Sequence, residues 1–177
     1  KSKMRVLVVN PPNKPYSSSS LLIEPIDVLT VAREKVNAKF LCSSAESIDL
    51  PDESLDVVIS TWVVGTIQGV DRKARAIDEA TRVLRKGGSI YLVENDLNGD
   101  FEYIRNRYPN VARTKAYNGW LENEMGFVPV SRFETYFGFD SLDEARLIIG
   151  SIWGEEASLR VSRKDIGHNI VIYEKRK

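Results

Sequence analysis

Two short stretches of the sequence, Met4–Val9 and Leu55–Thr61, each contain an unbroken run of apolar, mostly β-branched residues, at Val6–Val9 and Val57–Ile59. A strand with one face in water alternates apolar and polar residues, whereas a strand covered on both faces is apolar throughout. Both stretches are too short for a typical helix, and Asn10-Pro11-Pro12 ends the first of them. The sequence therefore predicts parallel strands in the middle of a layered α/β protein.

Amphipathic helical segments separate the predicted strands. Ile26–Val36 and Asp71–Lys86 carry apolar residues at helical spacing, and Gly87-Gly88 predicts a C-terminal stop for the second helix. Further strands are predicted at Leu21–Glu24, Lys39–Cys42 and Ser89–Glu94. This alternation predicts a three-layer α/β/α sandwich around a mostly parallel sheet, whose ligands would bind at the carboxyl ends of the strands.

The C-terminal third of the sequence has a different pattern. Phe127–Phe137 alternates with a period of two, as in an antiparallel strand, and Asn169–Glu174 is the last predicted strand. Between them, Ser141-Leu142-Asp143-Glu144 is a capping box that opens a helix through about Trp153. We expect the last two strands to form an antiparallel edge hairpin, which completes a seven-stranded sheet in a single domain, residues 1–177. Two more helices are predicted at Asp100–Tyr108 and Thr114–Met125.

The composition argues against several classes of protein and site. The chain has 177 residues, with 25 Lys and Arg against 25 Asp and Glu, so a mainly electrostatic nucleic-acid binder is not expected. No apolar run reaches the roughly 18 residues that a membrane span needs. The single cysteine, Cys42, excludes an internal disulfide and favours a reducing, cytoplasmic location. Because Cys42 and His168 are each the only residue of their kind, we expect no metal site.

Three segments carry a family resemblance: Ile23–Arg33, Ala45–Ser60 and Glu79–Gly88. The first is similar to a second strand that ends in an acidic residue, together with the helix after it. The second is similar to an adenine-binding loop with the fourth strand. The third is similar to a helix with a double-glycine turn before strand five. These are parts of the class I S-adenosylmethionine-dependent methyltransferases, in particular the small-molecule group called type 11 or UbiE-like. The resemblance implies a Rossmann-like fold and S-adenosylmethionine as the cofactor.

The resemblance also implies a set of cofactor-binding residues. Glu24 would accept hydrogen bonds from the ribose hydroxyls, and charge-assisted bonds of this kind contribute roughly 1.5–3 kcal/mol each. Ile26 and Ala45 would enclose the adenine, and Ser44 would contact its edge. Asn10 and Ser60 would lie near the methionine end. The acceptor of the methyl group is not specified by any of these segments.

One expected element departs from the family pattern. Where the family has an acidic residue and three glycines after the first strand, this chain has Val8, Asn10, Pro12 and Lys14. Glycine allows a tight turn close to a cofactor, and proline does not. A methyltransferase-like interaction or regulatory subunit without cofactor binding is therefore the alternative to an enzyme, with a nicotinamide enzyme as a third. No general base is visible in Trp62–Thr66.

The first crossover of the predicted fold is unusually short. Asn10–Ser20 has only 11 residues, three of which are prolines, whereas a crossover between parallel strands usually needs a dozen or more. We expect the first crossover helix to be reduced or absent. The sheet face that this helix would cover then needs a partner, most simply a second copy in a homodimer, or else the connection after strand six.

Several side chains outside these segments have two interpretations each. Trp62 follows a strand and could line the cleft or pack in the core, and Tyr117 with Trp120 could form a substrate lid by analogy. His168 begins the last strand, and we expect a structural or surface role, far from the cleft. A basic strip could meet an anionic substrate or RNA, or could be a solvated helix face; its residues are Arg105, Arg107, Arg113 and Lys115.

Overall fold

The structure is a computed structural model that describes residues 6–9, 43–105 and 110–177. Several predicted elements lie outside these residues. They are the crossover Asn10–Ser20, the strands Leu21–Glu24 and Lys39–Cys42, and the helix Ile26–Val36. The seven-strand count, the three-layer arrangement and the reduced crossover helix depend on these segments and stay predictions.

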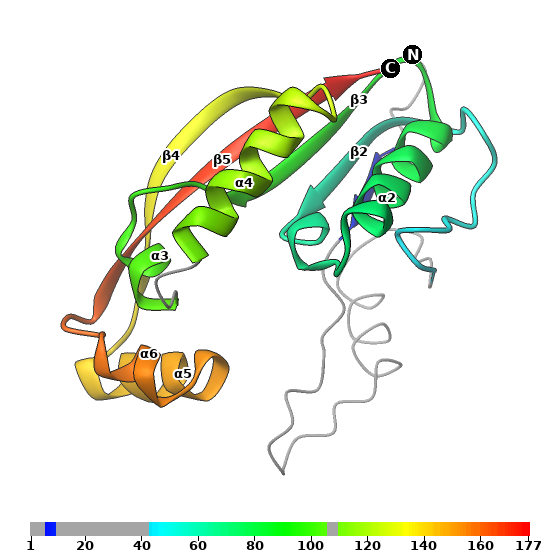
Figure 1. The fold of residues 1–177 in the computed structure, drawn as a ribbon. Coiled ribbons are helices and arrows are strands. Elements are labelled where there is room, and N and C mark those ends of the chain that lie inside the picture. Colours follow the sequence, from blue (N-terminus) through cyan, green and yellow to red (C-terminus); the bar gives the residue numbers. More distant parts are fainter. Residues whose placement is uncertain (1–5, 10–42, 106–109) are drawn as a thin grey trace.

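The described residues form a five-stranded mixed sheet in the order β1-β2-β3-β5-β4. The strands are β1 (Val6–Val9), β2 (Leu55–Thr61), β3 (Leu84–Asn95), β4 (Val128–Gly138) and β5 (Asp165–Arg176). β1, β2 and β3 run parallel to one another, whereas β5 is antiparallel to both β3 and β4. The predicted antiparallel pairing of the last two strands at one edge is confirmed (Figure 1).

Two helices, α2 (Val70–Val83) and α4 (Asn110–Asn123), lie over one face of the sheet (Figure 1). The apolar stripe of α2 and the inward side chains of the strands pack into one core, because alternate strand residues point toward the helices. A short 3-10 helix, η1 (Val64–Thr66), lies between β2 and α2 in the chain. The core includes Val58, Ile77, Val83, Ile90, Leu92, Leu121, Val171 and Tyr173.

A second, smaller core lies near the beginning of β5. It is formed with α3 (Asp100–Arg105), α5 (Leu142–Trp153) and α6 (Glu155–Leu159). The predicted cap of α5 is confirmed, because the Glu144 backbone N–H donates to Ser141 Oγ at 3.1 Å. No helix within the described ranges has the length and apolar character needed to cross a membrane.

The predicted end of the helix Asp71–Lys86 is wrong. α2 ends at Val83, and Leu84 already begins β3, so Gly87 and Gly88 lie inside a strand. The reason is a close approach of backbone: a Cβ on Gly88 would lie 2.8 Å from the Asp56 carbonyl oxygen, and Gly87 has a φ of +77°. The pair also exchanges hydrogen bonds of 3.0 Å with the Lys177 backbone. These glycines therefore serve the sheet and not a helix stop.

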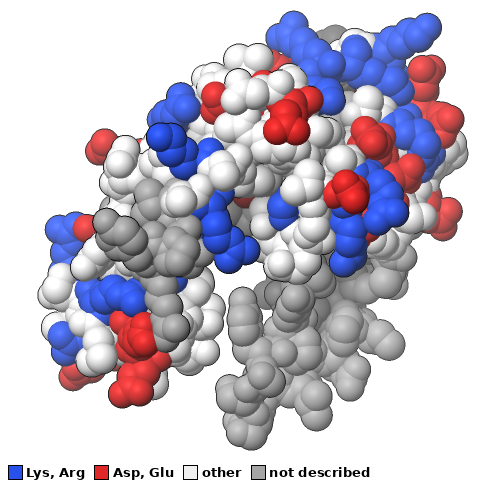
Figure 2. All heavy atoms as spheres, viewed as in Figure 1, with Lys and Arg blue, Asp and Glu red and all other residues white. Residues whose placement is uncertain are grey.

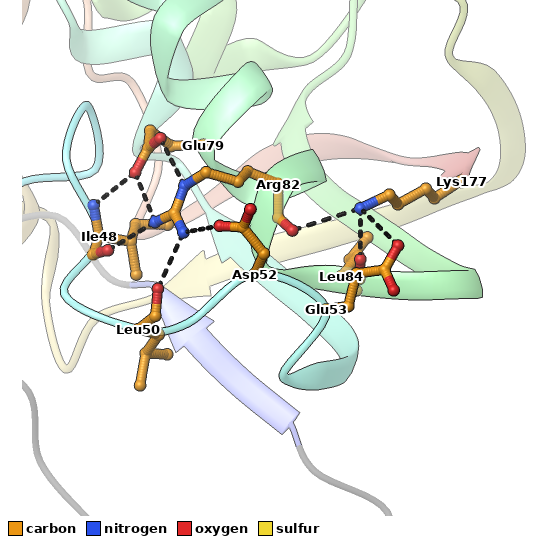
Figure 3. A network of polar contacts seen from close by, with 8 residues as sticks. All are labelled: Ile48, Leu50, Asp52, Glu53, Glu79, Arg82, Leu84 and Lys177. Atoms are coloured by element: carbon orange, nitrogen blue, oxygen red, sulfur yellow. Dashed lines mark hydrogen bonds and ion pairs between the residues drawn. The ribbon is translucent and has the colours of Figure 1, made fainter.

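Arg82 fastens the loop of residues 44–54, which we call the acidic loop, to helix α2 (Figure 3). Its guanidinium donates to the Ile48 and Leu50 carbonyl oxygens at 2.8 and 2.9 Å and pairs with Asp52 at 2.6 Å. Glu79 accepts from Arg82 and also from the Ile48 N–H, at 2.9 Å. The segment that resembles an adenine loop is thus held by the polar face of α2.

Candidate functional site

A cavity of about 720 Å³ opens beside the carboxyl ends of β2 and β3. Helix α2 and η1 form one wall, and α4 forms the opposite wall. The carboxyl ends of strands are the predicted place for ligands in such a sheet. The cavity is lined by Trp62, Gly65, Thr66, Val70, Lys73, Glu94, Asn95, Arg105, Arg113, Thr114, Ala116, Tyr117, Trp120, Glu124 and Trp153.

Glu94, near the end of β3, is the most buried carboxylate in this lining, with 3% of its surface exposed. Tyr117 Oη donates a hydrogen bond to Glu94 Oε1 at 2.9 Å, and the Gly65 backbone N–H donates to the same carboxylate. Burial raises the pKa of Glu94 to about 7, against the opposing effect of these donors and of Lys73. Glu94 can therefore take up and release a proton near neutral pH.

Gly65 lies against this carboxylate because it has no side chain. A Cβ at residue 65 would stand 3.0 Å from Glu94 Oε2. Lys73, one turn into α2, donates to the carbonyl oxygens of Gly65 and Ile67, and its ammonium lies 5.7 Å from the centre of the Tyr117 ring. Burial lowers the pKa of Lys73, and the Arg113 charge lowers it further. The wall of α2 thus places a partly buried cation near a fully buried carboxylate.

Two arginines of the predicted basic strip, Arg105 and Arg113, line the cavity. Arg105 is held by the buried Glu102 at 2.5 Å, and Thr114 Oγ1 donates to the other oxygen of Glu102 at 2.5 Å. Lys115 is exposed, and Arg107 lies outside the described residues. Figure 2 shows Lys and Arg side chains on both sides of the hollow in this face. The strip is therefore divided between the cavity and solvent.

The three tryptophans of the chain all line the cavity. Trp62 has a left-handed φ of +52°, which turns the chain directly after β2. Tyr117 and Trp120 stack with ring centres 6.0 Å apart. Trp62 lines the cleft, as one of its two interpretations predicted. Tyr117 and Trp120 lie on α4 and pack against the core, and their role in a substrate lid stays a prediction. The cavity has flat aromatic walls.

His168 is closer to the cleft than predicted. Its Nε2 is 2.8 Å from Asn95 Oδ1, a cavity residue, and its ring stacks on Phe137 and lies 5.9 Å from Trp62. β5 begins at Asp165, so His168 is an interior residue of a strand beside β3. Burial lowers the pKa of His168 to about 4, which keeps the ring neutral at physiological pH. The ring packs beneath the cavity floor, and the expected structural role stays a prediction.

Three of the six predicted cofactor residues lie within the described part of the chain. Ser60 is 3% exposed near the end of β2, opposite Val9 of β1, and within that part its hydroxyl has no hydrogen-bond partner. Ser44 is exposed in the acidic loop, where its Oγ accepts from the Glu46 N–H at 3.1 Å, and Ala45 is half-buried beside it. Asn10, Glu24 and Ile26 lie outside the described residues.

None of these six residues is among the described lining of the cavity. The lining includes Trp62, the Tyr117–Trp120 pair and two arginines of the basic strip, which the sequence analysis considered, but also Glu94 and Lys73, which it did not select. Glu94 was recognised only as the end of a strand, and Lys73 only as part of a helix. An acidic residue at the carboxyl end of a parallel strand was the available signal for Glu94. No group of His, Cys, Asp and Glu suitable for a metal ion occurs within the described ranges.

Comparison with known proteins identifies the fold first. A methyltransferase of Thermotoga maritima, described as a possible histamine N-methyltransferase, aligns over 100% of this chain and 84% of its own, with a TM-score of 0.54 at 16% identity. The YcgJ protein of Bacillus subtilis aligns over 86% of this chain and 78% of its own, with a TM-score of 0.52 at 18% identity. The chain therefore has a Rossmann-like methyltransferase fold.

Sequence comparison finds the same similarity over part of the chain. Residues 24–92 match the model of a family described as Methyltransferase domain. A ubiquinone/menaquinone biosynthesis C-methyltransferase of Campylobacter jejuni is 29% identical over 66% of this chain and 55% of its own length. A phosphatidylethanolamine N-methyltransferase of Cereibacter sphaeroides is 31% identical over 57% of this chain and 48% of its own. The matching segments are similar to class I S-adenosylmethionine-dependent methyltransferases, and the chain spans about half the length of these two relatives.

Proposed function

We propose that the protein transfers a methyl group from S-adenosylmethionine to an acceptor bound in the 720 Å³ cavity. The observation that carries this proposal is the position of the cavity, beside the carboxyl ends of β2 and β3 in a chain whose residues 24–92 match a methyltransferase family model. Bound S-adenosylmethionine would supply an activated methyl group. Such a transfer is a single displacement, so the protein can act largely by holding its reactants in line, which contributes roughly 7–11 kcal/mol.

The cofactor would bind on the β1 side of the cavity. Ser60 supports this, because a buried hydroxyl without a partner in the described structure fits a polar ligand group. Ser44 and Ala45 would contact the adenine from the acidic loop, whose position Arg82 maintains. Glu24, Ile26 and Asn10 would contact the ribose, the adenine and the methionine end, as the resemblance implies.

Calorimetric titration with S-adenosylhomocysteine tests this function. We expect saturable binding by the wild-type chain, loss of binding in Glu24→Ala, and unchanged binding in Glu134→Ala, whose side chain is exposed on β4. Absence of binding at millimolar ligand would overturn the enzymatic proposal. Ser60→Ala, which removes a buried hydroxyl but little volume, would distinguish a role in binding from a role in folding if its thermal stability is normal.

A non-catalytic interaction subunit is the second candidate, and strand β4 favours it. β4 forms an edge of the described sheet, and four of its apolar side chains are exposed by 47–71%. Edge strands of this kind can pair with another chain. The exposed residues are Val128, Val130, Phe133 and Tyr136.

A homodimer and a cytoplasmic location belong to the same set of proposals. The single cysteine favours the location, and the exposed apolar side chains of β4 favour a partner. Light scattering that gives a mass of twice 20.0 kDa would support the homodimer, and a monomer would contradict it. The interaction-subunit function would be supported if S-adenosylhomocysteine does not bind while the chain still self-associates.

A further inference from the structure

The walls of the cavity are aromatic on several sides. Trp62, Tyr117, Trp120 and Trp153 line it, and they come from the β2 end, α4 and α5. Tyr117 and Trp120 present stacked rings at an interplanar angle of 27°. Flat apolar surfaces of this kind pack best against a flat ring, in stacked or edge-to-face contact. The shape and chemistry of the walls therefore favour a planar aromatic ligand.

The charges in the walls favour an anionic group on that ligand. Lys73 and Arg113 face the same cavity from α2 and α4, and their like charges repel, which contributes to the lowered pKa of Lys73. Arg105 adds a third cation, although Glu102 accepts two hydrogen bonds from it. An anion between Lys73 and Arg113 would remove this repulsion and form charge-assisted hydrogen bonds. A cationic ligand would increase the repulsion.

One carboxylate in the lining is placed to take a proton. Glu94 Oε1 accepts from Tyr117 Oη, and Gly65 donates to the same carboxylate, so two fixed donors hold its orientation. Glu124, the other carboxylate of the lining, is exposed directly after the end of α4. A buried, oriented carboxylate that borders a ligand cavity is the geometry of a general base.

Resting on the proposed methyltransferase function, we propose that the acceptor is a planar aromatic molecule with an anionic group, and that Glu94 accepts the proton released by its nucleophile. The nucleophilic atom forms a bond to the methyl carbon as the carbon–sulfur bond of the sulfonium donor breaks. Sulfur keeps that electron pair and becomes a neutral thioether. The proton that leaves the nucleophile passes to an oxygen of Glu94 and later to water.

The three tryptophans provide a direct measurement, because all of them line this cavity. Quenching of their fluorescence is titrated with salicylate, salicyl alcohol and 2-hydroxybenzylamine, which share a ring and differ in charge. We expect salicylate to bind at least tenfold more tightly than the neutral alcohol, and the amine to bind most weakly. The preference for salicylate over the neutral alcohol should fall at least threefold in Arg113→Gln. It should be unchanged in Lys115→Gln, because Lys115 is an exposed neighbour on α4.

Equal binding of the three probes, tighter binding of the amine, or no quenching by any of them would overturn the predicted acceptor class. Calorimetry with S-adenosylhomocysteine on the same preparation tests the methyltransferase function separately. If it binds while the three probes fail, only the acceptor class is wrong. If it does not bind while salicylate does, the methyltransferase function is wrong and the cavity is an anion site of another kind.

The proton transfer is tested with 4-nitrophenol, whose absorbance shows whether the bound molecule is protonated. Binding to the wild-type chain should increase the phenolate fraction at least twofold, and this increase should be lost in Glu94→Gln. If Glu94 acted only through its negative charge, Glu94→Gln would have the opposite effect. Removal of that charge from the wall would stabilise the phenolate and increase its fraction. A larger phenolate fraction in Glu94→Gln, or an unchanged one, would therefore overturn the assignment of Glu94. Glu94→Asp, which keeps the carboxylate, should retain part of the increase.

Discussion

Tyr117 on α4 donates a hydrogen bond of 2.9 Å to Glu94 near the end of β3, and this bond connects the α4 wall of the cavity to the sheet. Burial raises the pKa of both groups, so Tyr117 stays protonated as a donor while Glu94 changes its charge near pH 7. The bond therefore joins a constant donor to an acceptor whose charge depends on pH.

The ionisation of Glu94 should be visible in the tryptophan fluorescence of the protein. We expect a transition with a midpoint near pH 7 in the wild type, its loss in Glu94→Gln, and its retention in Glu124→Gln. The charged groups that act on Glu94 are Lys73 on α2 and Arg105 on α3. A transition that persists in Glu94→Gln would assign it to another group.

Removal of the Tyr117 hydroxyl should shift the midpoint of the Glu94 transition. Tyr117→Phe keeps the ring against Trp120 but deletes the hydroxyl that stabilises the ionised carboxylate. We expect the midpoint of Glu94 to rise by about one pH unit, which corresponds to about 1.4 kcal/mol. Tyr136→Phe, with its hydroxyl on the exposed strand β4, should leave the midpoint unchanged and serves as the control.

The buried His168 should make the protein sensitive to acid. Because its pKa falls from 6.5 to about 4 on folding, the unfolded state binds the extra proton first. Its contribution to stability is complete above about pH 6.5 and decreases as the pH falls toward 4, by up to roughly 3 kcal/mol. Thermal melts of His168→Gln should show a smaller loss over this range than melts of the wild type. Equal losses would contradict a neutral His168.

The glycine at residue 88 should be intolerant of a side chain. Gly88→Ala places a Cβ 2.8 Å from a backbone oxygen of β2, so the two strands must separate. We expect a loss of about 1–3 kcal/mol in the free energy of unfolding. Gly119→Ala is the matched control, because its Cβ meets only the Asn123 side chain at 3.7 Å, and alanine favours a helix by about 0.5–1 kcal/mol. Denaturant melts that rank the two variants in the opposite order would contradict this account.

Arg82 should stabilise the acidic loop more than a neighbouring arginine of the same helix does. Arg82→Met removes donors to two loop carbonyls, whereas Arg75→Met removes a single ion pair of 3.7 Å with Glu46. We expect a larger fall in Tm for Arg82→Met, together with faster amide exchange at Ile48. If both variants lose the same stability, the network in Figure 3 does not hold the loop.

The regular elements were largely predictable because each leaves a local pattern. The buried strand Leu55–Thr61 and the helix capped by Ser141 were predicted within one residue of their bounds. The end of α2 was not, since a glycine pair has the same local appearance at a helix stop as in a strand that approaches another backbone. Asp56 and Lys177, far away in the sequence, decide between these two.

The sequence by itself determined the fold class, the methyltransferase resemblance and the antiparallel edge, because periodicity and short motifs are properties of neighbouring residues. Only the tertiary structure decided which side chains form the cavity. Lys73, Glu94 and Tyr117 come from three separate elements, and no local pattern connects them. Their burial together sets their pKa values, because desolvation acts through space and not along the chain.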